Sequence, residues 1–89
     1  MEFEFDPTKS AANRQKHGID FEPAQALWSD ERLIEVEART EGEPRFLIVA
    51  RLGHSHWSAV ITYRAGRTRI ISVRRSRPEE IALYEDPDL

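Results

Sequence analysis

The spacing of hydrophobic and polar positions changes partway along this 89-residue chain. Residues 2–5 (EFEF) alternate with a period of two, which predicts a short strand. Asp6 and Pro7 follow as a preferred N-cap and a preferred first helical residue, and Gly18 is a preferred residue just past a helix end. The pattern therefore predicts a helix over residues 7–17 directly after the strand.

A second, shorter helix is predicted next, ending near residues 29–30. Asp20 is its expected cap, and Pro23 is tolerated within a first turn. The apolar residues with helical spacing are Phe21, Ala24, Leu27 and Trp28.

From residue 32 onward the pattern favours strands separated by short turns. The strand candidates are residues 32–37, 44–50, 57–64 and 68–74, and the turn signals are residues 40–43, 53–55 and 65–66. Such short connections favour an antiparallel meander over crossover units. Pro78 then opens a C-terminal helix through Tyr84, for which Ser76 is the expected cap. We expect one α+β domain over residues 1–89, ordered β-α-α-β-β-β-β-α, with helices packed on a mainly antiparallel sheet.

Composition narrows the classes of protein that fit. Hydrophobic residues make up 39% of the chain, enough for one small core, and charged residues make up 33%. The chain has no cysteine, which excludes disulfides, thiolate catalysis and cysteine-based zinc sites. Residues 1–7 lack the apolar stretch of a secretion signal, and the longest apolar run, FLIVA, is too short to span a bilayer. A soluble, cytoplasmic protein is therefore expected.

The most informative charge pattern is a concentration of arginine near the end of an acidic chain. The net charge is −3, yet six of the eleven arginines lie within residues 64–77. A local cationic field of this kind binds phosphates, nucleic acid or an acidic partner. The alternative is that these arginines pair with the abundant carboxylates and only solubilise a sheet.

The turn at Ala65-Gly66 decides where these arginines point, and it can close in two ways. A two-residue loop would pair Arg64 with Arg67 and place Thr62, Arg64, Arg67 and Arg69 on one face. It would also force Ala65 to a positive φ, which is unfavourable. A three-residue loop would avoid this by pairing Tyr63 with Arg67. The sequence leaves both registers open.

Several kinds of chemistry are excluded or disfavoured by the motifs. The chain has no Gly-rich phosphate loop, no G-x-S-x-G and no H-E-x-x-H. His54 and His56 could share a strand face, but no third ligand is near in sequence, so no metal site is expected. Trp28 and Trp57 are interpreted as packing residues. His17 is either a cation at a helix C-terminus or a general acid/base.

Three long segments of the chain resemble one bacterial toxin family. They are FEFDPTKSAANRQKHGIDFEPA, PRFLIV and TYRAGRTRIISVRRSRPEEIALY. They are similar to the toxins of BrnT/BrnA toxin–antitoxin pairs, which are ribonucleases with a RelE-like fold. Ile61 and Ser76 depart from the family's usual Tyr and Ala. The family pattern falls on His17, Gly18, Thr62, Arg64, Arg69, Ser72, Arg74, Glu80 and Tyr84.

The resemblance implies a metal-independent endoribonuclease, without cofactors, that inhibits translation. The RNA 2′-hydroxyl would attack the adjacent phosphate, which requires a base, an acid and cations for the developing charge. Arg64 and Arg74 are the candidates for charge stabilisation, and His17, Glu80 and Tyr84 for proton transfer. The candidates for holding the RNA backbone are Lys16, Arg67, Arg69 and Arg75.

The resemblance also implies a partner, and two other readings stay open. The partner is a cognate BrnA-like antitoxin of the ribbon-helix-helix class, through which alone operator DNA would be contacted. The first alternative is a non-catalytic module that binds RNA or an acidic protein through the same arginines. The second is a toxin fold that has lost its activity.

Overall fold

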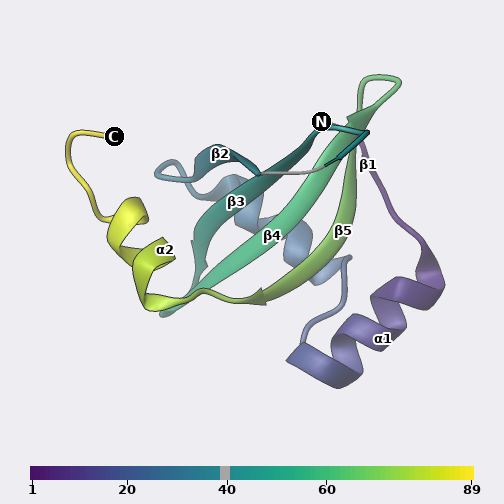
Figure 1. Cartoon of the computed structure of the whole chain (residues 1–89). Helices are drawn as coiled ribbons and strands as arrows, with labels where there is room; N and C mark the ends of the chain where they lie inside the picture. The colour runs from purple at the N-terminus through teal and green to yellow at the C-terminus, as the bar shows by residue number, and fades with distance from the viewer. Residues whose placement is uncertain (39–40) are drawn as a thin grey trace.

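The computed structural model describes residues 1–38 and 41–89 (Figure 1). Its elements follow the predicted order, and no helix in the described part of the chain is long and apolar enough to cross a membrane. The turn expected at residues 40–43 includes Thr40, which lies outside the described residues. The elements are β1 (Phe3–Glu4), α1 (Pro7–His17), the 3₁₀ helix η1 (Pro23–Ser29), β2 (Ile34–Ala38), β3 (Arg45–Leu52), β4 (Ser55–Arg64), β5 (Arg67–Arg75) and α2 (Pro78–Tyr84).

The strands form one mixed sheet in the order β1-β5-β4-β3-β2. Strands β2 to β5 are an antiparallel meander, as the short connections predicted. Strand β1 lies parallel to β5, with Phe3 opposite Thr68 and Glu4 opposite Arg69. The chain is therefore an α+β protein with a mainly antiparallel sheet.

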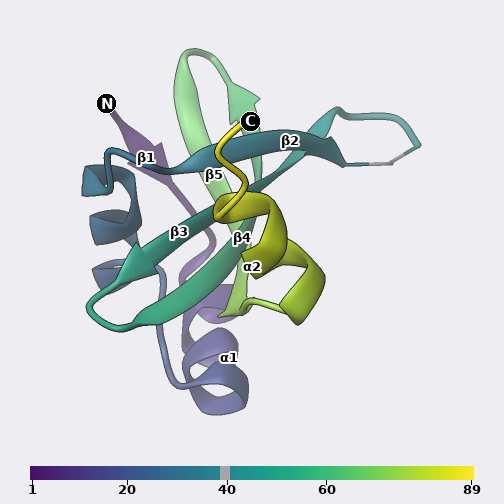
Figure 2. The same ribbon diagram turned by 90° about the vertical axis from the view of Figure 1, so that its left-hand side faces the viewer.

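The hydrophobic core lies between one face of this sheet and the segment that contains η1. Phe21, Leu27 and Ile61 are fully buried there, and Trp28 and Trp57 pack against them as partly buried residues. Both tryptophans are thus packing residues, as predicted. Helix α2 lies on the opposite face from η1, as the two views together show (Figures 1 and 2).

Helix α1 is attached to the rest of the fold by polar side chains. The Asp6 carboxylate caps its N-terminus by accepting a hydrogen bond from a first-turn N–H at 2.8 Å, and Gly18 ends it with a φ of 83°, both as predicted. The buried residues of α1 are Ser10 and Asn13. Ser10 Oγ accepts a hydrogen bond from the Phe21 N–H at 2.8 Å, which fixes the chain between α1 and η1.

Asn13 joins α1 to the outer edge of β5, beyond the end of β1. Its Oδ1 accepts a hydrogen bond from the Val73 N–H at 3.1 Å, and its Nδ2 donates to the Val73 carbonyl at 2.9 Å and to the Ile19 carbonyl at 2.8 Å. Unpaired backbone groups on a strand edge invite pairing with other chains. One buried side chain here takes the place of a neighbouring strand.

The predicted start of the second helix is wrong in its cap and in its helix type. The N-cap is Glu22, without a side-chain hydrogen bond, and the element is a 3₁₀ helix. Since the Phe21 N–H is bonded to Ser10, the chain after Asp20 is held in a turn, and Asp20 contributes only its main-chain carbonyl, to the Ala24 N–H at 3.3 Å.

The predicted cap of α2 is also wrong. The helix begins after Arg77, and the Ser76 hydroxyl is hydrogen-bonded to Ser58 Oγ at 2.8 Å. Ser76 therefore binds the sheet instead of the helix end, a tertiary contact that local sequence does not reveal.

The hairpin between β4 and β5 closes through the two-residue loop. Arg64 pairs with Arg67, and both Ala65 (φ 50°) and Gly66 (φ 77°) are left-handed. This is the geometry of a type I′ turn, whose twist matches that of the flanking strands. The twist therefore outweighs the unfavourable φ of Ala65, which had favoured the longer loop.

Ala65→Asn should stabilise the protein by about 0.5 to 1 kcal/mol, because Asn tolerates a positive φ better than Ala does. Ala65→Val should destabilise it, since a β-branched residue fits this conformation poorly. Urea unfolding measures both, and equal stabilities of the two variants would contradict the turn geometry.

Asn13→Ala should lower the free energy of unfolding by about 3 kcal/mol, because three buried backbone groups lose their partner. Asn13→Asp should be at least as destabilising as Asn13→Ala, since it keeps the acceptor for the Val73 N–H but turns a buried carboxylate oxygen toward the Val73 and Ile19 carbonyls. Gln15→Ala, on the exposed side of the same helix, is the matched control. Thermal and urea unfolding of all four proteins test this, and an Asn13→Ala variant as stable as Gln15→Ala would refute it.

Candidate active site

Most of the polar residues singled out from the sequence lie on one face of the sheet, the face that α2 partly covers. We call it the arginine face and define it by Arg64, Arg67, Arg69 and Arg74. The hairpin register places Arg64 opposite Arg67 and Thr62 opposite Arg69. Since residues two apart on a strand share a face, the first three arginines lie together at the hairpin end.

Arg74 reaches the same face because β5 contains a bulge. Arg69 and Arg74 are five residues apart, so in a regular strand they would point to opposite faces. The register shifts at Ile71, since Ile61 pairs with Ile70 but the preceding Val60 pairs with Ser72. Arg74 therefore pairs with Ser58, which lies on the same face of β4 as Val60, Thr62 and Arg64. One extra residue puts all four arginines on one face.

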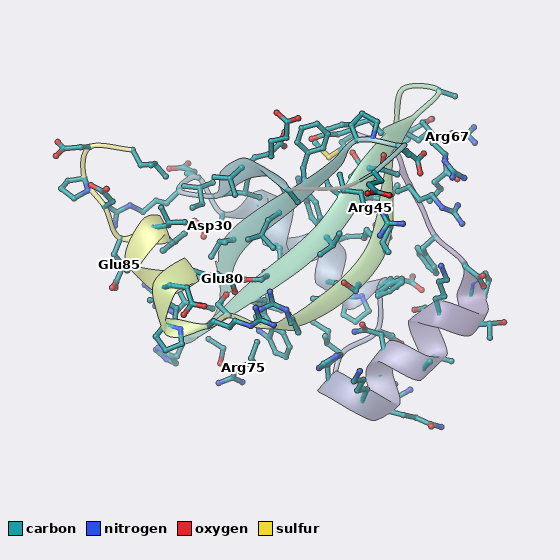
Figure 3. The ribbon with its side chains drawn as sticks, viewed as in Figure 1. Asp30, Arg45, Arg67, Arg75, Glu80 and Glu85 are labelled. Atoms are coloured by element: carbon teal, nitrogen blue, oxygen red, sulfur yellow. The ribbon has the colours of Figure 1, made fainter. Side chains whose placement is uncertain are left out.

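The arginine face has two ends that a single phosphate cannot bridge. Arg74 is level with Ser58, and Arg64 follows six residues later on β4. At about 3.3 Å per residue, the two positions are about 20 Å apart. Figure 3 shows the two ends of the sheet, with Arg67 at the hairpin end and Glu80 at the other. The two predicted charge-stabilising arginines therefore cannot both contact one phosphate.

Arg74 is held rigidly by Glu80 of α2. Its Nη1 and Nη2 atoms donate to the two carboxylate oxygens of Glu80, each at 2.8 Å. Glu80 is 7% exposed and also accepts hydrogen bonds from Ser58 Oγ at 2.8 Å and from the Arg77 N–H at 2.9 Å. The bond from Arg74, together with those from the Arg77 N–H and the Ser58 hydroxyl, lowers the pKa of Glu80 to about 2 against the cost of its burial. Such a carboxylate is a weak base and a good positioning group.

Arg74 nevertheless keeps donors for a ligand. Glu80 and the Arg75 carbonyl take both Nη1 hydrogens and one Nη2 hydrogen. Within the described part of the chain, the Nε–H and the second Nη2–H have no partner. Since a guanidinium donates in a planar fork, these two remaining groups match two oxygens of one phosphate.

The arginines of the hairpin end are paired with carboxylates in a more exposed setting. The shortest contacts are 2.7 Å for Arg64–Glu43, 3.2 Å for Arg67–Glu2 and 2.8 Å for Arg69–Glu4. The side chains of Arg64 and Glu43 are 52% and 35% exposed, against 24% and 9% for Arg74 and Glu80. Exposed ion pairs contribute little to stability and are screened by salt. A ligand can therefore replace these carboxylates more easily than it can replace Glu80.

Tyr84 has a structural position beside the arginine face. Its hydroxyl donates to Asp30 Oδ2 at 2.6 Å, and its ring packs edge-on against His56 at 5.2 Å. Burial and the bond to Asp30 raise the pKa of Tyr84. Asp30 also accepts hydrogen bonds from the backbone N–H groups of Arg32 at 2.9 Å and Arg51 at 2.8 Å. Tyr84 thus anchors α2 to the loop after η1.

Three further candidate residues lie away from the arginine face. Arg75 follows Arg74 and points to the opposite face, where its guanidinium lies 5.2 Å from the centre of the Trp57 ring. Lys16 and His17 are in the last turn of α1, and no side-chain hydrogen bond or ion pair joins either of them to another described residue. The fold therefore gathers Arg64, Arg67, Arg69, Arg74 and Glu80 and leaves Arg75, Lys16 and His17 elsewhere.

The described residues contain no cluster of three or more His, Asp or Glu side chains that could hold a metal ion. His54 is exposed, and the Nε2 atom of His56 is buried without a hydrogen-bond partner among these residues. The candidate site consists of guanidinium groups and their carboxylates.

Sequence reasoning missed two residues that shape the site, Ser58 and Glu43. Ser58 is a buried polar residue inside the otherwise apolar segment WSAVI, and that contrast was a usable signal. Glu43 lies in a polar loop with many acidic neighbours, and nothing in its local sequence marks it.

Glu80→Gln should destabilise the protein at pH 7, and it should make the free energy of unfolding depend less on pH in the acid range. The folded pKa of Glu80 is about 2, below the ordinary 4.5, so ionised Glu80 favours folding. This contribution is complete well above pH 4.5 and is lost as the pH falls toward 2. At about 1.4 kcal/mol per pKa unit it is on the order of 3 kcal/mol.

Urea unfolding at pH 7 and at pH 3 measures this contribution. Glu79→Gln, at an exposed neighbouring position on α2, is the matched control and should behave like the wild type. Identical pH profiles of the two variants would show that Glu80 is not held by Arg74 as described.

Comparison with known proteins agrees with the resemblance seen in the sequence. A search of curated proteins gives no match to the chain. One protein-family model, described as "Ribonuclease toxin, BrnT, of type II toxin-antitoxin system", matches residues 5–80. The match includes β5 with its bulge, all four residues of the arginine face, and Glu80. Since it covers most of the chain, the protein belongs to the BrnT family of ribonuclease toxins of type II toxin–antitoxin systems.

Proposed function

We propose that this protein is a metal-independent endoribonuclease that cuts single-stranded RNA on the arginine face and so inhibits translation. The observation that carries this proposal is Arg74, which Glu80 holds from one side while its Nε–H and one Nη2–H remain for a ligand. A rigid guanidinium with free donors is suited to a developing negative charge, because it does not need to reorganise during the reaction.

The chemistry is transesterification within the RNA strand. The 2′-oxygen attacks the neighbouring phosphorus, the bond from phosphorus to the 5′-oxygen breaks, and a cyclic phosphate remains. The 2′-hydroxyl loses its proton to a base, and the leaving 5′-oxygen gains one. Arg74 stabilises the extra charge on the phosphate oxygens through its paired N–H donors.

The other candidate residues take supporting roles in this proposal. Glu80 is a positioning residue for Arg74, because its low pKa makes it a poor proton acceptor. Tyr84 orients α2 through Asp30. His17 and Lys16, the predicted proton-transfer and RNA-binding residues of α1, are not on the arginine face, so this proposal gives them no role there. The proposed contacts to the RNA backbone are made by Arg64, Arg67 and Arg69.

Membership of a type II family implies a cognate antitoxin. We propose that it is a ribbon-helix-helix protein that covers the arginine face, that operator DNA is contacted only through it, and that the pair acts in the bacterial cytoplasm. The arrangement of three helices on a five-stranded mixed sheet fits the RelE-like fold that the resemblance implies.

One observation favours an alternative function, a binding module without catalysis. All four arginines of the arginine face are engaged by carboxylates, and the one carboxylate bonded to Arg74 is a weak base. In that case the protein would bind RNA or an acidic partner and leave RNA intact.

Arg74→Ala should lower the rate of RNA cleavage by about 100- to 1,000-fold, as expected when one donor to a developing anion is removed. Arg75→Ala is the matched control, because Arg75 is adjacent in sequence and points to the opposite face. It should change the rate only a few-fold. Cleavage of single-stranded RNA in EDTA measures both, and thermal unfolding shows that each variant is folded.

Arg74→Lys separates charge from geometry, since lysine keeps the charge without the planar fork. It should fold and remain slow. Equal rates for Arg74→Ala and Arg75→Ala would reject the site, and RNA binding without cleavage by the wild type would favour the binding module.

A further inference from the structure

The hairpin end of the arginine face contains an anion site that is occupied by the protein's own Glu43. Arg64 donates to its carboxylate from Nε at 2.7 Å and from Nη2 at 3.2 Å. The bond and charge of Arg64 lower the pKa of Glu43, and the charges of Arg45 and Arg69 contribute further. One carboxylate therefore lies in the combined field of three guanidinium groups, from β3, β4 and β5.

Arg45 belongs to this face although the sequence did not single it out. Leu47 pairs with Val60, and Arg45 precedes Leu47 by two residues on β3, so Arg45 points to the same side as Thr62 and Arg64. It is exposed, and Figure 3 shows it near the hairpin end of the sheet, the end that also carries Arg67.

The loop that carries Glu43 is fixed to the sheet at the next residue. Thr62, which is 1% exposed, donates a hydrogen bond from its hydroxyl to the Pro44 carbonyl at 2.6 Å. Thr62 is thus a positioning residue for the loop. The side chain of Glu43 is partly exposed, at 35%, so an incoming anion can reach the arginines once it turns away.

We propose that Arg45, Arg64 and Arg69 form a subsite for a backbone phosphate of RNA, and that Glu43 fills this subsite until the RNA displaces it. The proposal rests on the proposed function. The subsite residues are level with Thr62 and Arg64, four to six residues from Ser58 along β4, and so about 13 to 20 Å from Arg74. Its phosphate therefore lies a few nucleotides away from the bond that is cut. The subsite binds and aligns the strand, and Arg74 acts at the reacting phosphate.

A phosphodiester can take the place of the Glu43 carboxylate. Each spreads one negative charge over two oxygens, and Arg64 already donates to two carboxylate oxygens in a planar arrangement that also matches phosphate. Arg69 is also bonded to Glu4 at 2.8 Å, so a strand of successive phosphates can exchange with two carboxylates on the same face. The continuity with Arg74 favours an RNA strand as the ligand.

Binding of a non-cleavable RNA tests the subsite separately from catalysis. The probe is a single-stranded RNA of about ten nucleotides, within the usual site size of such proteins, with its 2′-hydroxyls methylated. Glu43→Gln should bind it about fivefold more tightly than the wild type, since no carboxylate has to leave the arginines. Glu41→Gln removes the same charge from an exposed position of the same loop and is the matched control.

Arg45→Ala supplies the second arm. It should weaken binding several-fold and make the slope of log K against log salt concentration less negative by about 1, as the loss of one phosphate contact predicts. Fluorescence anisotropy over a range of salt concentrations measures both quantities, and thermal unfolding confirms that the variants are folded.

The outcomes separate the subsite from the function on which it rests. If the wild type neither binds nor cuts RNA, the proposed function itself fails. If it does both, but Glu43→Gln matches Glu41→Gln and Arg45→Ala matches the wild type, only the subsite is overturned. It is also overturned if Arg45→Ala weakens binding of the antitoxin while the salt slope for RNA is unchanged, because the cluster then receives a protein.

Discussion

The bulge at Ile71 determines what the sheet of this protein presents to solvent. Strand residues alternate between faces, so a regular β5 would leave Arg67 and Arg69 on one side and Arg74 on the other. The extra residue returns Arg74 to the side of Arg64, where it meets Ser58 and the carboxylate of Glu80. The bulge also helps to place helix α2, because Glu80, one of the two buried residues of that helix, bonds to both Arg74 and Ser58. The candidate site exists because one residue is unpaired.

The two ends of the arginine face differ because their carboxylates differ in burial. At the α2 end, Glu80 is fixed by hydrogen bonds from the chain around it and orients Arg74. At the hairpin end, Glu43 and Glu2 are on exposed segments and pair with arginines whose side chains are more than half exposed. The first arrangement suits a group that must not move during a reaction. The second suits contacts that form when a ligand arrives and break when it leaves.

Periodicity and capping residues predicted most of this fold, because α1, the strands and α2 follow local rules. The errors arose where a distant contact decided a local choice. Ser76 is a good cap by type, but Ser58 binds its hydroxyl, and the twist of β4 and β5 imposed a left-handed conformation on Ala65. The sequence did not predict the bulge, because Ile70 and Ile71 are both good strand residues and neither marks an interruption. The sequence therefore predicted which arginines belong to the candidate site, but not how they are arranged in space.

The net charge of −3 is compatible with an anion-binding surface because the carboxylates are distributed as counterions. Glu2 and Glu4 are on or beside β1, whose pairing with β5 brings them to Arg67 and Arg69, and Glu43 is brought to Arg64 by its loop. Binding of nucleic acid is an exchange of counterions in any case. In this protein some of the counterions are its own carboxylates. They neutralise the positive field of the arginines in the free protein, and in the proposed complex the RNA phosphates take their place. The sum of charges along a sequence therefore says less about its ligand than the pairing of each arginine does.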